Sequence, residues 1–456
     1  FLRVSPLVTP VMHPVHVVMH HWFIPTRLLW GSWEDFITGG PDGLNNSEYP
    51  VITAPTVGFA VGSLADYLGV PTSIPSLEVS ALPFRAYALL YNECYRDQDL
   101  EDELALSFDD GADTTTSVAL QRSDWSRDYF TTARPWPQKG PQVTVPVNAP
   151  TGTFAIQSDG PFQLLEPTEG VSSNLYAAND PGVNKHIYGA YRTTGDEGPL
   201  QYHSGLKFAS SGGELGSVDV NQLREAFALQ RFEEHRALYG SRYVEYLRYL
   251  GVKSSDARLQ RPEYLGGTRQ TIQFSEVLQT AEGNDPVGTL RGHGIGASRT
   301  PRYRRFFEEH GFVLSVMIVR PISVYMQGLA RMWNRRVKED YFQKELQHIG
   351  QQEVLTKELY AGSSTGPTSD DTVFGYQNRY DEYRAQNSYV SGEFRTILDS
   401  WHMARNFSNE PVLNADFINA VPTTRVFAAQ ENDTLYCMAN HSLQARRIMS
   451  RLGNPI

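Results

Sequence analysis

The stretch Gly311-Phe-Val-Leu-Ser-Val-Met-Ile-Val-Arg-Pro321 decides the fold class, because it is the clearest core strand of the chain. It is a run of β-branched and large apolar residues that closes on a proline. A second strand is predicted at Val15–Ile24, where Pro14 and Pro25 bound a segment that is largely apolar or amphipathic on both faces. A sheet that joins strands so far apart needs long-range, Greek-key-like connections, not local βαβ units.

Shorter patterns add further elements. Arg425–Ala429 and Leu435–Ala439 are predicted to pair as a hairpin across Gln-Glu-Asn-Asp-Thr. Helical spacing of apolar residues predicts helices at Asn221–Leu238, Ser241–Leu250 and Leu82–Tyr95. The helices are few, so the fold class is all-β with inserted helices.

The composition describes a folded, loop-rich β protein. The chain has 456 residues, of which 40% are hydrophobic and 20% charged, values that exclude a disordered polymer. Aromatic residues reach 12%, with 24 Tyr, and tyrosine serves both cores and interfaces. The 27 Pro and 37 Gly are spread along the chain and do not gather in one linker.

Charge and cysteine usage restrict the class further. A net charge of −11 argues against a surface that is basic all over, although it allows one basic face. Two cysteines, Cys94 and Cys437, indicate a reducing compartment and no disulfide framework. The sequence has no stretch of eighteen consecutive apolar residues, so no transmembrane helix is expected. The opening Phe1-Leu-Arg is neither an initiator methionine nor a signal peptide, and we expect an N-terminal arm to precede it.

The texture changes between Pro141 and Gly216, where Gly, Ser, Thr, Pro and Asn dominate. Short apolar runs such as Thr153–Ile156 predict small strands there. A structureless loop of this length inside a compact domain would be unusual. We therefore divide the chain into a core of residues 1–140 with 217–456 and a surface-exposed insertion at 141–216.

Two glycine-rich motifs suggest enzyme chemistry but lack its context. Gly362-Ser-Ser-Thr-Gly366 matches the serine-hydrolase pattern, yet no strand and amphipathic helix flank it as the strained turn requires. Gly292-His-Gly-Ile-Gly296 is not a nucleotide-binding loop, since neither a βαβ unit nor a Walker lysine accompanies it. We interpret the first as a flexible loop, and we expect no catalytic residue and no cofactor.

Histidines and carboxylates gather at two places without forming a convincing metal site. In a strand, His16 and His20 share one face while His21 lies opposite, so at most a pair converges; with His13, these are interpreted as packed or interface histidines. The acidic run is interpreted as a solvated loop, and it consists of Asp97, Asp99, Glu101, Asp102 and Glu103. No EF-hand pattern supports calcium, so no metal is expected.

Three basic segments are the strongest binding signals, because cations with aromatic rings suit single-stranded nucleic acid. The alternative is a salt-bridged, solvated surface, since Glu308, Glu309, Glu339 and Asp340 stand nearby. The candidate residues are Arg302, Tyr303, Arg304 and Arg305; Trp333, Arg335 and Arg336; and Arg446 and Arg447.

Several peptides rich in Pro, Gly, Arg and aromatics look like ordered loops and contact surfaces, not active sites. They are Trp33–Gly40, Leu82–Tyr87, Ala133–Gly140, Arg258–Gly267 and Phe374–Arg384. Further patches are Tyr95–Gln98, Asp128–Phe130, Ser275–Thr280, Phe307–Gly311, Gly350–Tyr360, Ser391–Arg395 and Trp401-His402. In this order, these peptides resemble the major capsid proteins of microviruses, small single-stranded DNA bacteriophages, and the gokushovirus branch most closely.

The resemblance implies an eight-stranded antiparallel jelly roll with long insertions between strands. It implies a small icosahedral shell, one copy per asymmetric unit, around circular single-stranded DNA. The 141–216 insertion stands where this family has a variable, host-facing protrusion at the three-fold axes. Implied partners are further copies of the chain, the DNA genome, a small basic DNA-binding protein, a DNA pilot protein, an internal scaffolding protein and a host surface receptor. The implied location is the virion, assembled in the bacterial host cytoplasm.

Two expectations follow for a capsid protein. The stiff peptides Arg134–Gly140 and Arg261–Gly267, with Trp136 and Tyr264, are predicted to be buried at subunit contacts or against the barrel. The basic segments are predicted to line the shell interior, since an acidic chain holds a polyanion only by segregating its cations. The competing interpretation is a carbohydrate-binding or carbohydrate-active β-sandwich, which would need paired acids in a cleft if it were hydrolytic.

Overall fold

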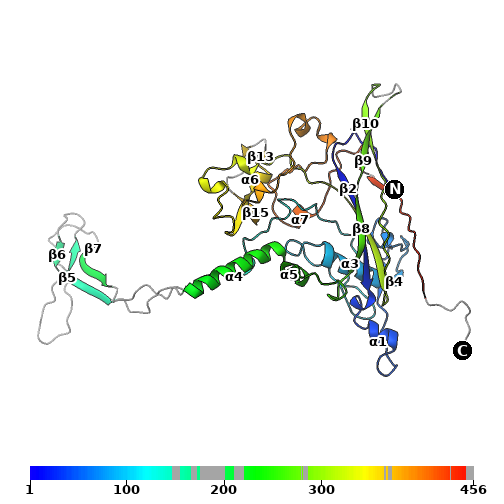
Figure 1. Ribbon diagram of the computed structural model, residues 1–456, viewed down its shortest axis with the longest axis horizontal. Helices are drawn as coiled ribbons and strands as arrows, with labels where there is room; N and C mark the ends of the chain where they lie inside the picture. Colours follow the sequence, from blue (N-terminus) through cyan, green and yellow to red (C-terminus); the bar gives the residue numbers. More distant parts are fainter. Residues whose placement is uncertain are drawn as a thin grey trace, which may run out of the picture. The chain divides into compact units, whose positions relative to one another are not determined.

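The computed structural model describes residues 1–145, 155–165, 172–174, 201–209, 220–278, 280, 286–363, 366–367, 372–431 and 433–447. The chain forms two compact units, residues 1–140 with 233–456 and residues 141–232. Strands dominate the first unit, with helices between them (Figure 1). Among the described residues, none of the helices combines the length and the apolar character that crossing a membrane requires.

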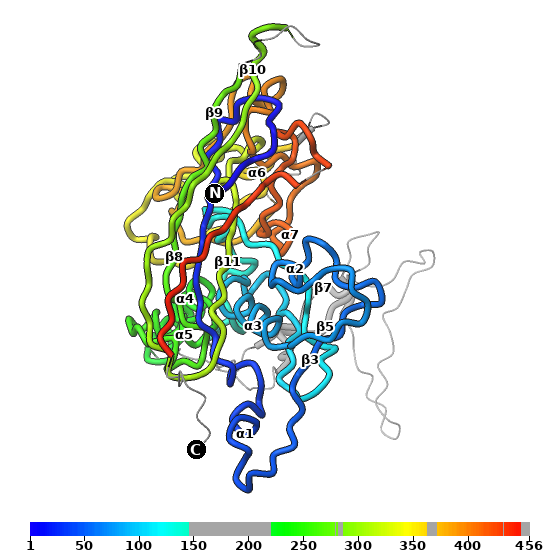
Figure 2. The backbone as a smooth tube through the Cα atoms, turned by 90° about the vertical axis from the view of Figure 1, so that its right-hand side faces the viewer, coloured from blue at the N-terminus to red at the C-terminus, as the bar shows by residue number. Residues whose placement is uncertain are grey.

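The central sheet of the first unit has the order β11-β2-β8. Strand β2 (Val15–Pro25) pairs antiparallel with β11 (Gly311–Pro321) over eleven residues, from Val15 opposite Pro321 to Pro25 opposite Gly311. Its other edge pairs antiparallel with β8 (Glu263–Thr271), and Figure 2 shows the three strands side by side. Both strands predicted from their apolar runs, and the long-range connection between them, are confirmed.

The peptide Arg261–Gly267 was expected to be a loop, and this expectation is wrong because residues 263–267 belong to β8. Its glycines serve the sheet instead. The β2–β8 register shifts between His21 and Trp22, and Gly266 there has φ +142°. A Cβ on Gly267 would lie 2.4 Å from the Met19 carbonyl oxygen, so glycine lets the two backbones approach.

A second antiparallel sheet has the order β16-β1-β10-β9. Its strands are β1 (Leu2–Val4), β9 (Gln273–Leu278), β10 (Leu290–Gly296) and β16 (Leu435–Cys437). Ile272, which is buried, separates β8 from β9, so one extended segment contributes to both sheets. A core cluster forms there from Leu2, Leu7, Val11, Val15, Val17, Ile272, Met403, Val426 and Phe427.

The hairpin predicted between residues 425–429 and 435–439 is wrong. Strand β16 pairs with β1, where Leu2 lies opposite Cys437, and Phe427 bridges to Leu7. Both halves of the expected hairpin therefore find their partners in the N-terminal segment. Local alternation could not reveal this competition, because strand pairing depends on residues more than four hundred positions away.

The three predicted helices are confirmed. They are α3 (Leu82–Leu90), continued by one π-helical turn η2 (Tyr91–Tyr95); α4 (Val220–Tyr239); and α5 (Tyr243–Tyr249). Pro83 in the first turn of α3 lacks only an N–H that would have no helical partner. Leu82, Ala86 and Leu90 of α3 pack against Trp22 and Ile24, so this helix covers one face of the central sheet.

The remaining elements of the first unit are short. They are η1 (Thr26–Leu28), α1 (Trp33–Thr38), β3 (Val51–Thr53), α2 (Leu64–Tyr67), β4 (Glu78–Ser80), η3 (Arg331–Trp333), η4 (Lys338–Asp340), β12 (Gln351–Leu355), α6 (Thr356–Leu359), β13 (Gly362–Ser363), β14 (Gly366–Pro367), β15 (Val373–Asn378), η5 (Asp381–Tyr383), η6 (Gly392–Arg395), η7 (Asp399–Trp401) and α7 (Ala415–Ile418). A further core around Phe130, Val354, Phe374 and Phe417 joins β12, β15 and α7.

The second unit contains one antiparallel sheet of order β6-β5-β7. The strands are β5 (Ala155–Leu165), β6 (Ser172–Asn174) and β7 (Gln201–Ala209). Small strands near Thr153–Ile156 were predicted, and β5 begins at Ala155. The role of this segment as a surface insertion stays a prediction.

Arg85 of α3 is fully buried and forms an ion pair with Asp113. Its Nε lies 2.8 Å from Asp113 Oδ2, and the two side chains are 1% and 0% exposed. Further donors satisfy the pair: Arg85 Nη1 donates to the Leu29 carbonyl, and Thr116 Oγ1 donates to Asp113. Although burial raises the pKa of Asp113, the Thr116 and Arg85 hydrogen bonds outweigh it, so that the pKa lies below its usual value.

We predict that Arg85→Met destabilises the unassembled chain by about 3–5 kcal/mol, because it leaves a buried carboxylate without its partner. The free energy of unfolding in urea measures this loss. Arg384→Met is the matched control: Arg384 pairs with Asp381 at 3.5 Å, but its side chain is 64% exposed. The control should cost about 1 kcal/mol or less. Equal losses in the two variants would contradict the account.

Candidate assembly and nucleic-acid surfaces

The loop Arg134–Gly140 is attached at its start to strand β15. The Arg134 N–H donates to the Tyr376 carbonyl at 2.9 Å, and the Tyr376 N–H donates back to the Arg134 carbonyl at 2.7 Å. The guanidinium lies 2.9 Å from Asp97 Oδ2 and 3.5 Å from Asp99 Oδ2. The loop therefore leaves the core from a fixed position beside a fully buried Ala133.

The acidic run anchors this loop, which corrects the expectation of a solvated segment. Asp99 forms ion pairs with both Arg134 and Lys139, and its side chain is only 5% exposed. Glu101 is buried, accepts a hydrogen bond from the Tyr91 hydroxyl at 3.2 Å, and has its pKa raised by burial. Only Asp102 and Glu103 are exposed. The partner cations stand about forty residues further along the chain, so local sequence could not indicate the pairing.

Trp136 lies half-buried at the middle of the loop. The Lys139 ammonium stands 5.2 Å from the centre of its ring, a cation–π distance. At the end of the loop Gly140 has φ +142°, and a Cβ there would lie 2.8 Å from a Glu233 carboxylate oxygen. Ion pairs at one end and glycine geometry at the other make the loop stiff, while the indole stays partly accessible.

The second predicted contact peptide is Arg261–Gly267. Its Arg261 side chain contacts other residues of the same chain, whereas its Tyr264 ring is half-exposed. Arg261 Nε lies 3.2 Å from Asp256, and its Nη2 donates to Cys94 Sγ at 3.6 Å. The Tyr264 ring is 4.9 Å from that of Trp22 but remains 49% exposed. The half-exposed ring on a rigid strand is the part of this peptide that another molecule could contact.

The first basic segment, Arg302–Arg305, lies between β10 and β11. Arg302 and Arg304 are exposed and form no ion pair within the described part of the chain. Arg305 differs, because its Nη2 lies 2.8 Å from Glu263. The Tyr303 ring packs 5.5 Å from that of His21 on β2. Two of the three arginines thus remain free to meet an anion.

The second basic segment is mostly engaged inside the chain. The Arg335 guanidinium stacks 4.5 Å from the Tyr383 ring and 5.3 Å from Tyr341, and its side chain is 16% exposed. Arg336 Nη1 donates to the carbonyls of Trp333 and Arg335. Trp333 itself is 62% exposed. Here the salt-bridged alternative describes Arg335 better than a nucleic-acid contact does.

The third segment, Arg446 and Arg447, is exposed and follows β16. On the way to it the chain passes His441, whose charge adds to burial in lowering the pKa of His21. Tyr303 of the first segment also contacts His21. Tyr303 and His441 thus both act on His21, whereas Arg331, two residues before Trp333 of the second segment, pairs with Glu358 and Glu382.

The four N-terminal histidines are packed, as predicted. One ring nitrogen of each has a close partner: the Ile322 carbonyl for His13, Thr271 for His16, the Tyr95 hydroxyl for His20 and Ser315 for His21. Within the described ranges, no three His, Cys, Asp or Glu side chains form a group that could hold a metal ion.

The remaining chemical motifs also have structural explanations. Gly292–Gly296 lies in strand β10 and is not a loop. Ser364 and Thr365 of the serine-hydrolase pattern lie outside the described residues. Cys94 and Cys437 are both free thiols; Cys437 Sγ lies 3.9 Å from Met317 Sδ.

Arg269 of β8 and Arg320 of β11 lie on the same face of the central sheet as His16, and neither was predicted from the sequence as a site residue. The alternation within Gly311–Pro321 was a usable signal for Arg320. The register that brings Arg269 beside it could not be read from sequence, because the bulge near Gly266 shifts the pairing.

A family model identifies the kind of protein that carries these surfaces. The model of the family described as "Capsid protein (F protein)" matches residues 1–456. This chain belongs to the phage F capsid-protein family. The resemblance to the major capsid proteins of microviruses is confirmed, and the protein is a structural component of a virion.

Three related proteins carry the name "Capsid protein VP1". The one from Bdellovibrio phage phiMH2K is 36% identical over 92% of this chain and 80% of its own length. Those from Chlamydia phage 1 and Spiroplasma virus 4 are 33% and 29% identical, over 95% and 91% of this chain and 85% and 80% of their own lengths. Membership of the capsid family, not a carbohydrate-active sandwich, therefore explains the chain. The carboxylates of Asp97 and Asp99, which stand close together in the sequence, form ion pairs with Arg134 and Lys139.

For this capsid protein we predict that Trp136→Ala reduces the yield of assembled particles several-fold, while the melting temperature of the unassembled chain changes little. The indole is partly accessible and its removal leaves the ion pairs of the loop in place. Particle yield by sedimentation and melting by circular dichroism measure the two effects. Tyr389→Ala, which removes an exposed aromatic ring that belongs to neither proposed surface, is the control and should assemble normally. Parental yield from Trp136→Ala would count against an assembly role.

Proposed function

We propose that this capsid protein self-assembles into a small icosahedral shell, with one copy per asymmetric unit, around circular single-stranded DNA. The observation that carries the proposal is the amount of apolar surface that a single copy leaves uncovered. Between β3 and β4 alone, Val57, Val61 and Tyr67 are 78%, 80% and 72% exposed. Exposed apolar side chains that follow one another in a single segment fit a contact surface, and capsid-family membership makes other copies the proposed partner.

The proposed shell contacts include the stiff loop Arg134–Gly140 and the exposed ring of Tyr264. A loop that is already ordered loses less conformational entropy on binding. The ion pairs of Arg134 with Asp97 and Asp99 supply that order within one copy. Arg261 is mostly buried and contributes indirectly, because its ion pair with Asp256 fixes the segment just before β8.

The proposed DNA-facing surface consists chiefly of Arg302, Arg304, Arg446 and Arg447. These are exposed cations in a chain of net charge −11, and they are carried by segments that approach His21. Tyr303 and Trp333 are proposed stacking partners for bases, while Arg305, Arg335 and Arg336 have internal partners and contribute less. Contacts to phosphates and ring faces would tolerate any base sequence.

The finer architecture and the other partners follow from family likeness. We propose that the antiparallel sheets belong to an eight-stranded jelly roll and that residues 141–216 form a host-facing protrusion at the three-fold axes. A small basic DNA-binding protein, a DNA pilot protein, an internal scaffolding protein and a host surface receptor are the proposed partners. Assembly is proposed to take place in the cytoplasm of the bacterial host.

Electron microscopy of the purified chain, together with size-exclusion chromatography, tests the central proposal. We expect closed particles of one diameter, alone or on addition of the proposed scaffolding protein. A monodisperse monomer under both conditions, with glycosidase activity, would overturn the proposal in favour of the carbohydrate-active alternative.

A deletion tests the role of the insertion. Replacing Val145–Leu215 with a short Gly/Ser linker should leave a soluble core, since surface insertions tolerate change. Particles that form should fail to infect the host. Circular dichroism and plaque counts provide the measurements. Complete unfolding of the deleted chain would contradict the division of the chain proposed above.

The DNA-facing surface is tested with Arg302→Gln/Arg304→Gln. We predict less DNA per particle and a shallower dependence of retention on salt, since each lost phosphate contact lowers the slope by about 0.7. Arg122→Gln/Arg258→Gln, two exposed arginines outside the basic segments, is the control and should package normally. Equal DNA content and equal salt resistance in the two variants would reject the assignment.

A further inference from the structure

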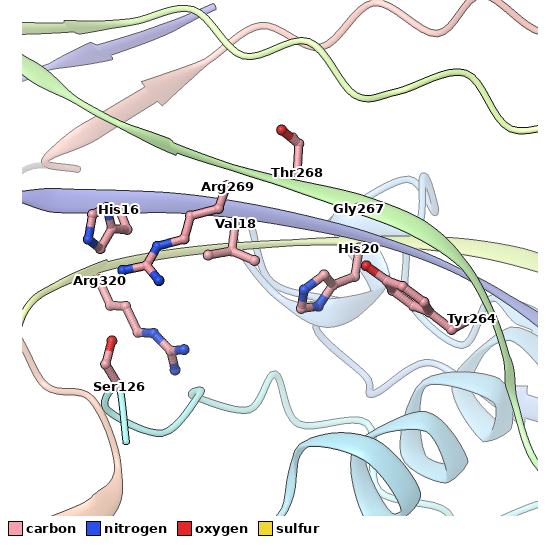
Figure 3. A pocket seen from close by; sticks show the side chains of 9 residues that line it. All are labelled: His16, Val18, His20, Ser126, Tyr264, Gly267, Thr268, Arg269 and Arg320. Carbon is pink, nitrogen blue, oxygen red and sulfur yellow. The ribbon is translucent and has the colours of Figure 1, made fainter. Parts of the chain in front are cut away.

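A cavity of about 350 Å³ opens on one face of the central sheet, and no residue of the basic segments lines it. Figure 3 shows it between the sheet and the segment that carries Ser126. It is lined by His16, Val18, His20, Ser126, Tyr264, Gly267, Thr268, Arg269 and Arg320. Its volume lies in the range of ordinary small-ligand sites.

The strand register explains why cations gather here. His16 of β2 lies opposite Arg320 of β11, and Val18 lies opposite Arg269 of β8, all on one face of the sheet. Further along the same face, Trp22 and Ile24 are covered by α3. At the His16 end, a polar cavity takes the place of that apolar contact.

The cavity holds more positive charge than its surroundings neutralise. None of the described residues that line it is acidic, and the side chain of Arg269 makes no hydrogen bond or ion pair within the described part of the chain. Arg320 donates to the main-chain carbonyl of Asp124. Burial lowers the pKa of Arg320; the charge of Asp124 opposes this effect, and the charge of Arg269 adds to it by a smaller amount.

Asp124 is the carboxyl group whose charge acts on Arg320. Burial, followed by the charges of Glu101 and Asp97, raises the pKa of Asp124 to about 7. Its Oδ1 has no hydrogen-bond partner. Two histidines respond in the opposite sense. Burial, and then the charges of Arg269 and Arg320, lower the pKa of His16; burial, and then the charge of Arg320, lower the pKa of His20. The charged form of these two histidines is therefore disfavoured, and an anion beside the arginines would relieve the repulsive part of this effect.

We propose that this cavity binds a phosphate group. The guanidinium groups of Arg269 and Arg320 extend to the same side of the sheet, with Ser126 beside them (Figure 3). Guanidinium groups match the oxygens of phosphate in charge and in geometry. The space exceeds what one phosphate needs, so a larger molecule that carries the phosphate could also enter. The phosphate is either a free ion or part of a single-stranded nucleic acid.

Titration calorimetry of the full chain with inorganic phosphate, in sodium chloride buffer, tests the proposal. We expect saturable binding that Arg269→Gln weakens at least tenfold and Arg269→Lys weakens less. Arg3→Gln is the matched control, because Arg3 is an exposed strand arginine of the other sheet. Melting temperatures show which variants fold. If Arg269→Gln does not fold, Arg269→Lys still allows the test.

A second arm distinguishes the two sources of phosphate. Competition by a short oligothymidylate would assign the cavity to a nucleic-acid phosphate, and binding without competition would assign it to the free ion. Either result supports the proposal. The absence of saturable phosphate binding to the parent, or equal affinity in the parent and folded Arg269→Gln, would overturn it. This outcome is independent of capsid assembly, which Arg269→Gln should leave intact.

Discussion

The structure depends on the pairing of β2 with two strands from distant parts of the chain. β2 bonds along its whole length to β11 on one edge and to β8 on the other. Closing such long loops costs conformational entropy. The burial of apolar side chains on the face that α3 covers offsets this cost. Once the sheet is formed, its edges and connections determine where the basic segments and the cavity lie.

Strong local patterns were sufficient to predict the parts of the fold that have little competition. The apolar runs of β2 and β11 and the helical spacing in α3, α4 and α5 each favour one structure. The errors arose where distant partners compete. Leu435–Cys437 pairs with β1 instead of with its neighbour, and the glycines of β8 permit a bulge although their composition is typical of a loop.

The candidate site was predictable as a set of charges but not as a set of contacts. Sequence identifies every arginine, yet Arg302 and Arg304 remain free while Arg335 is stacked between two tyrosines. The same holds for acids, since Asp99 is buried against Arg134 and Lys139 and Asp102 is not. An ion pair between residues forty positions apart leaves no local signature, and burial decides whether a charge can serve another molecule.

The central claim is that one sheet organises a capsid protein with distinct surfaces for other copies and for DNA. A reconstruction of the assembled particle by electron cryomicroscopy tests this claim most directly. The account predicts that Arg302, Arg304, Arg446 and Arg447 face the interior, and that Trp136 lies within contact distance of a neighbouring copy. Density that places these arginines on the outer surface, or Trp136 against solvent far from any neighbour, would contradict it.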